Sequence, residues 1–378
     1  MLHRAAALLS CAAVLAASAH AEDARKPDVF KSAVTGKPVY RSLDALDFGP
    51  GGILLIGDGL GRQVLAVETG DTAPAAAWTA ALDKIDEKIA GRLGADAKGV
   101  TILDMAVNPA SGRAYVAVRK EDDKSLLILT VDGAGRIEEF APASVRFAAV
   151  PLGSGSASTL NKITDVAWAG DRVLAAGRAN EEFACKMFVA AVPLAHESAA
   201  SVYSAETYHV SHRKWETKAP MSTVLPFEQN GKRYMVGAFS CTPVVKYRLD
   251  DLTPDAKVKG VSVVELGSGN RPLDMIAYEK GGKAFVLVNT FRFHHAKKPF
   301  GPSPYWTVRL DADLLGEDAE VNEKAANRLG KGPAAAKMTM VEAYHGVVEM
   351  SPLDKERALV LRRDPKTEVL SLAPLPLP

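Results

Sequence analysis

Short apolar runs recur from about residue 46 to residue 375, and most are followed by a turn that contains glycine. Residues 115–118 and 126–129 form two such runs, separated by a polar loop. Runs of this length are too short for helices and are typical of β-strands that pair in hairpins. The pattern therefore predicts an all-β protein.

The strands form an internal repeat. Six segments each contain a short strand, a turn, a second strand, a polar loop and a third strand, and four of them open with aspartate. The matching positions are Asp47, Asp104, Asp165, Ser222, Asp274 and Val348, at spacings of 57, 61, 57, 52 and 74 residues. The last spacing is lengthened by residues 291–337, in which 318–329 has helical character, and residues 80–93 predict a second helix.

Repeats this short cannot bury both faces of a sheet alone, so they have to pack against their neighbours. We therefore expect a six- or seven-bladed β-propeller with short helical insertions, formed as a single domain by residues 22–378. A seventh blade requires that residues 304–310 and 338–344 contribute one. Residues 34–41 are strand-like, and we expect them to add an outer strand to the last repeat and close the ring.

Two segments carry a resemblance to known repeats. Residues 104–118 and 267–276 place a turn and an aspartate around the innermost strand, and resemble YVTN-type and NHL-type propeller repeats. The YVTN tetrapeptide itself and the Trp-Asp signature of WD repeats are absent from the sequence. The resemblance implies a secreted bacterial propeller and concerns the fold alone.

Residues 1–21 have the pattern of a Sec signal peptide. Arg4 precedes an Ala/Leu/Val core, which ends in the small-x-small sequence Ala19, His20, Ala21. We expect cleavage after Ala21 and a periplasmic or secreted protein. No apolar run in the mature chain is long enough to cross a bilayer.

Charge and motifs narrow the possible functions. The full chain has 46 basic and 45 acidic residues, and removal of Arg4 with the signal leaves a net charge of zero. This balance argues against nucleic-acid binding. Motifs for covalent haem, zinc proteases, common serine hydrolases and P-loop enzymes are absent from the sequence. The repeated aspartates are interpreted as structural acceptors of backbone N–H bonds.

One face of the predicted ring gathers the chemically rich loops. Residues 203–220 and 291–306 belong to that face, together with the ends of the second strands. The candidate ligand-binding residues there are Arg119, Arg178, Arg292, Arg362, Trp215 and Trp306. Arginine forks with aromatic anchors suit an anionic ligand or an acidic protein partner.

The same loops contain four of the mature histidines. His209, His212, His294 and His295 are candidate ligands of a divalent metal, although surface or packing roles are the alternative. Cys185 and Cys241 lie at matching places in successive repeats. The sequence is compatible with two alternatives, a disulfide between them or two buried free thiols.

We therefore expect a monomeric binding module, with no resident cofactor other than a possible divalent metal. The alternative is a propeller enzyme. It would be a metal-dependent lactonase or esterase, for which Asp58, Asn161, Asn289 and Glu349 are the candidate set, or the subunit of a quinone-dependent dehydrogenase.

Overall fold

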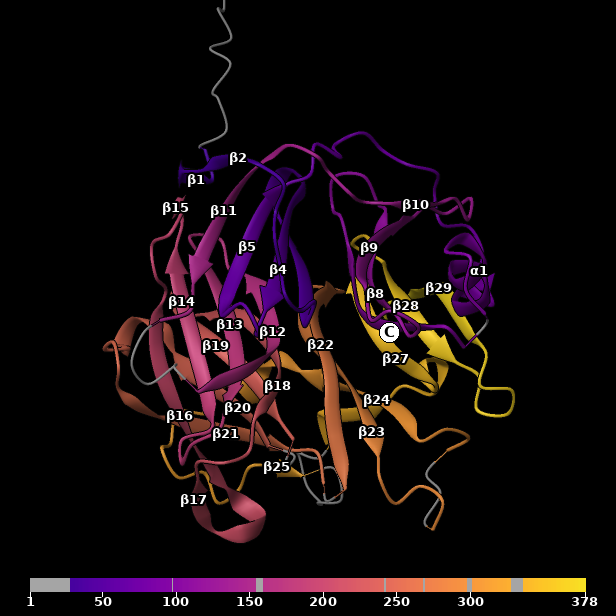
Figure 1. The fold of residues 1–378 in the computed structure, drawn as a ribbon. Coiled ribbons are helices and arrows are strands. Elements are labelled where there is room, and N and C mark those ends of the chain that lie inside the picture. Colours follow the sequence, from indigo (N-terminus) through magenta and orange to yellow (C-terminus); the bar gives the residue numbers. More distant parts are fainter. Residues whose placement is uncertain are drawn as a thin grey trace, which may run out of the picture.

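The computed structural model describes residues 28–96, 98–153, 159–240, 243–267, 269–297, 301–327 and 336–378. The expected signal segment 1–21 and Cys241 lie outside these ranges. Antiparallel strands make up most of the described chain, and no described helix is both long and apolar enough to span a membrane. The fold is a β-propeller (Figure 1).

The strands of the described residues divide into six groups of four or five, each with one innermost strand. We call these groups blades and number them by the chain order of their innermost strands. Blades 3 and 4 share one ten-stranded sheet, because their outer strands pair with each other in parallel. Blade 1 contains β3 (Ala45–Gly49), β4 (Ile53–Asp58), β5 (Gln63–Glu68), β11 (Val145–Pro151) and β2 (Val34–Gly36). Blade 2 contains β7 (Val100–Val107), β8 (Ala114–Lys120), β9 (Leu126–Val131) and β10 (Ile137–Glu139). Blade 3 contains β12 (Leu160–Trp168), β13 (Arg172–Ala179), β14 (Cys185–Ala191) and β16 (Ser201–His209).

Blade 4 contains β18 (Met221–Gln229), β19 (Lys232–Phe239), β20 (Pro243–Arg248) and β21 (Lys257–Glu265). Blade 5 contains β22 (Asn270–Lys280), β23 (Lys283–Arg292), β24 (Tyr305–Asp311) and β26 (Met338–Met340). Blade 6 contains β27 (Val347–Pro352), β28 (Arg357–Arg363), β29 (Leu370–Pro376) and β6 (Leu82–Asp83). The segments proposed for a seventh blade are therefore β24 and β26, the outer half of blade 5.

The blades do not follow one another around the ring in chain order. Neighbouring innermost strands give the order 2, 1, 3, 4, 5, 6, and blade 6 closes against blade 2. Blade 2 is inserted between β5 and β11 of blade 1, so the chain leaves blade 1, builds blade 2 and returns to complete blade 1. A regular repeat in the sequence does not reveal this detour.

Ring closure differs from the sequence expectation for residues 34–41. β2 pairs with β11 at the edge of blade 1, whereas β6, just before blade 2, supplies the outer strand of blade 6. The following helix α1 (Ile85–Arg92) is shorter than residues 80–93, because Lys84 adopts a left-handed conformation at its start. Residues 318–327 contain no helix; the nearest helical turn is η5 (Ala312–Gly316).

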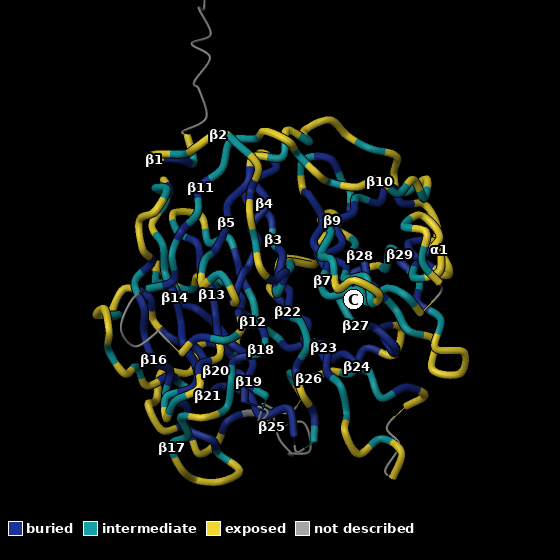
Figure 2. Tube along the Cα trace, in the orientation of Figure 1, coloured by how far each residue is buried: buried dark blue, intermediate teal, exposed yellow. Residues whose placement is uncertain are grey.

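The hydrophobic core is divided among the six seams between blades. Each of six apolar clusters joins two adjacent blades, as Leu54 of blade 1 meets Tyr115 of blade 2, and Leu55 of blade 1 meets Ile163 of blade 3. Successive residues of one strand therefore pack into opposite seams. Figure 2 shows the burial of the strands around the ring and the exposure of the connecting loops. Each blade depends on both of its neighbours.

Candidate functional site

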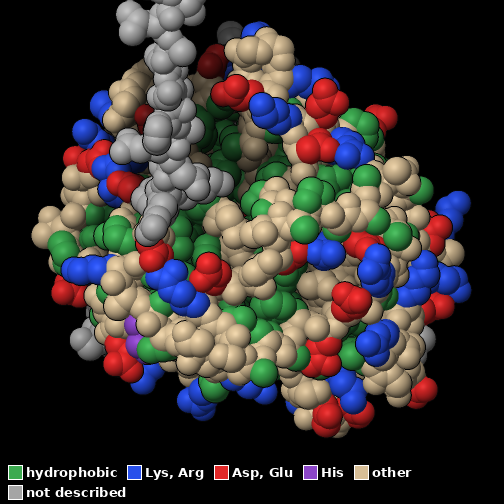
Figure 3. Space-filling view, turned by 90° about the horizontal axis from the view of Figure 1, so that it is seen from above, with side chains coloured by type: hydrophobic (Ala, Val, Ile, Leu, Met, Phe, Trp, Pro, Cys, Tyr) green, Lys and Arg blue, Asp and Glu red, His purple; other side chains and the backbone are tan. Residues whose placement is uncertain are grey.

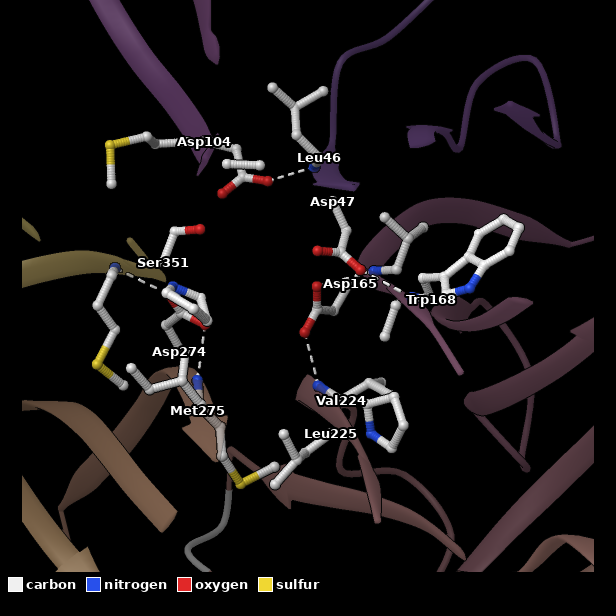
Figure 4. Close-up of a pocket in the computed structure, with 18 of the residues that line it drawn as sticks. Leu46, Asp47, Asp104, Asp165, Trp168, Val224, Leu225, Asp274, Met275 and Ser351 are labelled. Carbon is white, nitrogen blue, oxygen red and sulfur yellow. Dashed lines mark hydrogen bonds between the residues drawn. The ribbon is translucent and has the colours of Figure 1, made fainter. Parts of the chain in front are cut away.

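The innermost strands surround a central channel of about 300 Å³. Figure 4 shows that Asp47, Asp104, Asp165 and Asp274 point into this channel from four different blades. Three of these aspartates follow a one-residue bulge in the strand, which re-aims the next side chain. Measured from that bulge, the residues that match one another are Asp104, Asp165, Thr223, Asp274 and Glu349. β3 has no bulge, and Ala45 matches them because the N–H of the following residue, Leu46, is bonded as those of Val224 and Met350 are.

The channel aspartates join the blades through backbone hydrogen bonds. Asp165 accepts the N–H of Val224 at 2.6 Å, and Asp274 accepts the N–H of Met350 at 2.9 Å. Asp104 accepts the N–H of Leu46 in the same way. The structural role expected from the sequence is present, although the donors belong to the innermost strand of the next blade and not to a nearby turn.

A second level of bonds lies two residues further along the strands. Asp47 accepts the N–H of Trp168 at 2.7 Å, and the Ser351 hydroxyl oxygen accepts the N–H of Val107 at 3.0 Å. The two levels together bridge five of the six seams. Between blades 4 and 5, Thr223 and Leu225 occupy the matching positions, and no such bond joins the described residues there.

Burial of the channel carboxyl groups favours their protonated forms. Burial raises the pKa of Asp104 to about 7, with further contributions from the charges of Asp274 and Asp47. Burial likewise raises the pKa values of Asp47 and Asp274 to about 6, and that of Asp165 well above its ordinary value. The channel carboxyls therefore retain protons at pH values where exposed aspartates are ionised.

A second hollow of about 440 Å³ lies where the innermost strands begin and the second strands end. We call that end of the ring the loop face, and this hollow, between blades 2, 5 and 6, the rim cavity. Its wall combines aliphatic side chains with one phenol and a few charged groups. The lining residues are Asp86, Lys98, Val100, Thr101, Ile102, Arg271, Leu273, Tyr305, Val348, Glu349, Leu361, Arg363 and Leu370.

Basic groups predominate in the rim cavity. Lys98 and Arg271 are exposed, and Arg363 is half-buried with Glu368 3.1 Å away at the surface. Arg271 also lies over the Phe291 and Phe293 rings, with its guanidinium carbon 5.9 and 5.6 Å from their centroids. Acidic and basic side chains are interspersed over the face of the molecule shown in Figure 3. The three basic residues of the rim cavity outnumber its two acidic residues.

Glu349 lies at the boundary between the rim cavity and the channel. Burial raises its pKa well above the ordinary value, and the charges of Asp104, Asp274 and Asp165 raise it further, whereas Lys162 acts in the opposite direction. A protonated Glu349 does not cancel the charge of the nearby arginines. Asp86 is the other acidic residue in the wall.

The arginines selected from the sequence lie at one end of the ring but do not line this cavity. In the strand register Arg119, Arg178, Arg292 and Arg362 oppose the first residues of their innermost strands. Arg119 pairs with Glu121 at 2.8 Å, and Arg362 donates to the carbonyl of His345. The sequence prediction missed Lys98, which precedes the innermost strand β7, and Arg271, which precedes the bulge of β22. Both were missed because the prediction considered arginines at the ends of the second strands.

The two tryptophans differ in their surroundings. Trp306 is fully buried, and its indole N–H donates to Asn270, so it presents no surface to a partner. Trp215 is half-buried, packs edge-on against Tyr208 at 5.5 Å, and has the Lys259 ammonium 4.7 Å above its ring.

The structure separates the four candidate histidines into two pairs. His209 and His212 lie together with Glu216, and these three are the sole group of potential metal ligands within reach of one another in the described part of the chain. Burial disfavours protonation of His209, but Glu265 and Glu216 outweigh it and raise its pKa. His294 is exposed, and the pKa of His295 is lowered by burial and by Arg292 and His345.

The candidate lactonase residues have other partners. Asp58 is buried and accepts the backbone N–H groups of Ser42 and Gly61. Asn289 accepts the N–H of Asp274, and Asn161 donates to Asn180 at the surface. Glu349 alone of this set lines the rim cavity.

Cys185 is buried, and burial raises the pKa of its thiol to about 12. Cys241 lies outside the described residues, so the disulfide remains a sequence prediction.

No family model matches the sequence, and no curated protein matches it. Among solved structures, a chain of a mitotic checkpoint complex is similar over 98% of this chain and 99% of its own length, with a TM-score of 0.37 and 9% identity. Raptor from Chaetomium thermophilum covers 91% of this chain with 29% of its own length, at a TM-score of 0.37 and 11% identity. The GH43 protein BlXynB from Bacillus licheniformis is similar over 73% of this chain and 53% of its own length, with a TM-score of 0.38 and 11% identity. Likenesses of this size say nothing about activity, and the propeller assignment stands on the ring of sheets.

Proposed function

We propose that the protein is a binding module whose rim cavity takes an anionic ligand with an apolar body, such as a medium-chain carboxylate. The observation that carries this proposal is that Lys98, Arg271 and Arg363 line one hollow together with six aliphatic residues. Guanidinium groups bind carboxylates through paired hydrogen bonds. Aliphatic walls stabilise a bound chain by about 25 cal/mol for each Å² of apolar surface removed from water.

The direct test compares ligands that share a chain and differ in head-group charge. Isothermal titration calorimetry of the purified mature chain should detect decanoate binding and much weaker binding of decanol or decyltrimethylammonium. Arg271→Ala should weaken decanoate binding, whereas Arg178→Ala, at the same end of blade 3, serves as the matched control. Equal affinity for the three ligands, or equal loss in both variants, would contradict the proposal.

Export to the periplasm or to the exterior, as a monomer, is part of this proposal. The support for export is the sequence pattern of residues 1–21. Amino-terminal sequencing of the secreted protein should begin at Glu22, and retention of the first 21 residues would refute cleavage.

A second candidate function is acid–base catalysis on an ester or glycoside bound in the rim cavity. Glu349 favours it, because a carboxyl group with a raised pKa beside other carboxyls at a cavity is the arrangement that general acids require. A panel of p-nitrophenyl esters and glycosides tests it. Turnover that disappears in Glu349→Gln while decanoate still binds supports catalysis, and turnover equal in both proteins excludes this role for Glu349.

A further inference from the structure

A short hairpin at the outer edge of blade 3 brings metal-binding side chains together. The chain leaves β16 at His209, turns through η3 (Val210–His212) and returns in β17 (Lys214–Glu216). Arg213, in the left-handed conformation, closes the turn. His209 pairs with Lys214, and Glu216 pairs with Thr207 two residues back, so His209 and Glu216 are diagonal neighbours on one face of the ribbon.

The ligating atoms are close enough to share one ion. Atoms of His209, His212 and Glu216 all lie within 4.8 Å of one another. The His209 Nδ1 atom is 3.3 Å from Glu216 Oε2, and His212 Nδ1 is 2.7 Å from Glu216 Oε1. Bonds of about 2.0–2.2 Å to Zn²⁺ place tetrahedral ligand atoms roughly 3.3–3.5 Å apart, so small side-chain rotations complete the site.

A buried carboxylate orients the first histidine. Glu265 of β21 is 1% exposed, and its Oε2 atom lies 3.4 Å from His209 Nε2, on the side of the ring opposite Glu216. The N–H of Val210 donates to Glu265 Oε1 at 3.0 Å and fixes this carboxylate. A carboxylate behind a ligating imidazole is the usual outer partner of a protein metal site, because it sets the tautomer and the ring direction.

The hairpin also leaves room for a ligand from solvent. The His212 side chain is 51% exposed and that of Glu216 is 18% exposed, whereas His209 is enclosed. Lys214, whose ammonium lies 3.4 Å from Glu216 Oε1, has an exposed side chain that can turn away. The site offers two imidazoles, one carboxylate and an open coordination position. First-row divalent metals prefer such nitrogen-rich ligand sets, whereas calcium and magnesium prefer oxygen ligands.

We propose that His209, His212 and Glu216 bind one divalent transition-metal ion, for which Zn²⁺ is the test ion, and that Glu265 is a positioning residue for His209. His294 and His295 take no part. The site is separate from the rim cavity and does not depend on the function proposed for it.

Calorimetric titration of the chelator-treated full mature chain with Zn²⁺ tests the proposal. One ion should bind for each chain. His212→Ala, an exposed substitution that spares the core, should lower the affinity at least 100-fold, and Glu265→Gln about 10- to 100-fold. The His294→Ala/His295→Ala double variant is the matched control and should bind Zn²⁺ as the wild type does.

Co²⁺ supplies a second readout, because its visible absorption reports nitrogen and oxygen ligation directly. The spectrum should appear at one equivalent and disappear in His212→Ala. If the cluster is only a network of hydrogen bonds, Zn²⁺ will show no one-to-one site tighter than on the order of 10 μM. Equal Zn²⁺ affinity in His212→Ala and in the His294/His295 control would also overturn the proposal.

Discussion

The central channel and the rim cavity are built by the same innermost strands, yet their polar groups have different roles. In the channel, Asp165 and Asp274 accept N–H groups from the next blade, and their neighbours are other carboxyls. In the rim cavity, Arg271 and Arg363 line the wall together with aliphatic residues, and burial raises the pKa of Glu349, one of the two acids there, well above its ordinary value. Leu273 and Asp274 are adjacent in sequence, and one lines each hollow.

From this difference we infer that polar residues that recur at matching positions of the blades have a structural role. Charged residues that line one hollow without recurring are candidates for ligand binding. The aspartates at the matching position of blades 2, 3 and 5 meet the same need each time, namely an acceptor for an N–H of the next innermost strand. The charged groups of the rim cavity come from blades 2, 5 and 6 and follow no repeat. Removal of a channel group should therefore change stability, and removal of a rim group should change affinity.

The largest effect should follow loss of both rim guanidinium groups. Arg271→Ala/Arg363→Ala should weaken decanoate binding at least about 100-fold, because a hydrogen bond to a charged group contributes about 1.5–3 kcal/mol. Both side chains reach solvent, so the thermal midpoint should change little. Calorimetry and thermal melting together make the check. Unfolding of the variant would show that these arginines stabilise the fold, as the channel aspartates do, and would contradict the distinction between the two hollows.

Loss of a channel acceptor should have the opposite signature. Asp165→Ala leaves the N–H of Val224 without its acceptor and should lower stability by about 1–3 kcal/mol, with unchanged decanoate affinity. Measurement at pH 5 limits the relief of charge repulsion. Asp165→Asn, which keeps a carbonyl oxygen as an acceptor, is the control and should lower stability less. Equal losses in both variants would contradict the bridging role.

The pH dependence of stability should come from the channel. The folded pKa values of Asp104, Asp47 and Asp274, at about 7, 6 and 6, exceed the ordinary value of aspartate in the unfolded chain. The folded state therefore holds more protons between pH 4 and 7, and this stability, complete at pH 4, is lost as the pH rises through 7. Asp104→Asn should flatten the fall of the thermal midpoint from pH 5 to 8. A slope identical to the wild type would count against the raised pKa.

The smallest effect should be that of Glu349, which lies at the boundary of the two hollows. Burial raises the pKa of Glu349 well above its ordinary value, so its proton should be retained to higher pH than that of an exposed glutamate, and in mildly acidic solution Glu349→Gln should change decanoate affinity less than about threefold. At high pH the wild-type carboxylate should repel the ligand and the glutamine variant should not. Affinity titrations at pH 6 and pH 9 separate the two proteins. A large loss at pH 6 in the variant would show a direct contact that the raised pKa does not explain.

The sequence predicts the propeller and the aspartates of the innermost strands because both recur along the chain. A repeat can be recognised without knowing which residues lie close together in space. It assigns Asp104, Asp165 and Asp274 correctly to matching positions, whereas Asp47 acts two residues further along its strand. The insertion of blade 2 is hidden because each blade keeps the same local pattern. Arg271 and Lys98 are hidden because their cavity joins blades that are distant in sequence, and only the ring order brings those blades together.

The central claim, that the rim cavity and not the channel holds an anionic ligand, is tested most directly by crystals grown with 11-bromoundecanoate. Anomalous scattering locates the bromine independently of model bias. The account predicts a single bromine site among the aliphatic residues of the rim cavity, with the carboxylate facing Arg271 and Arg363. Bromine in the central channel, or on the surface away from blades 2, 5 and 6, would contradict it.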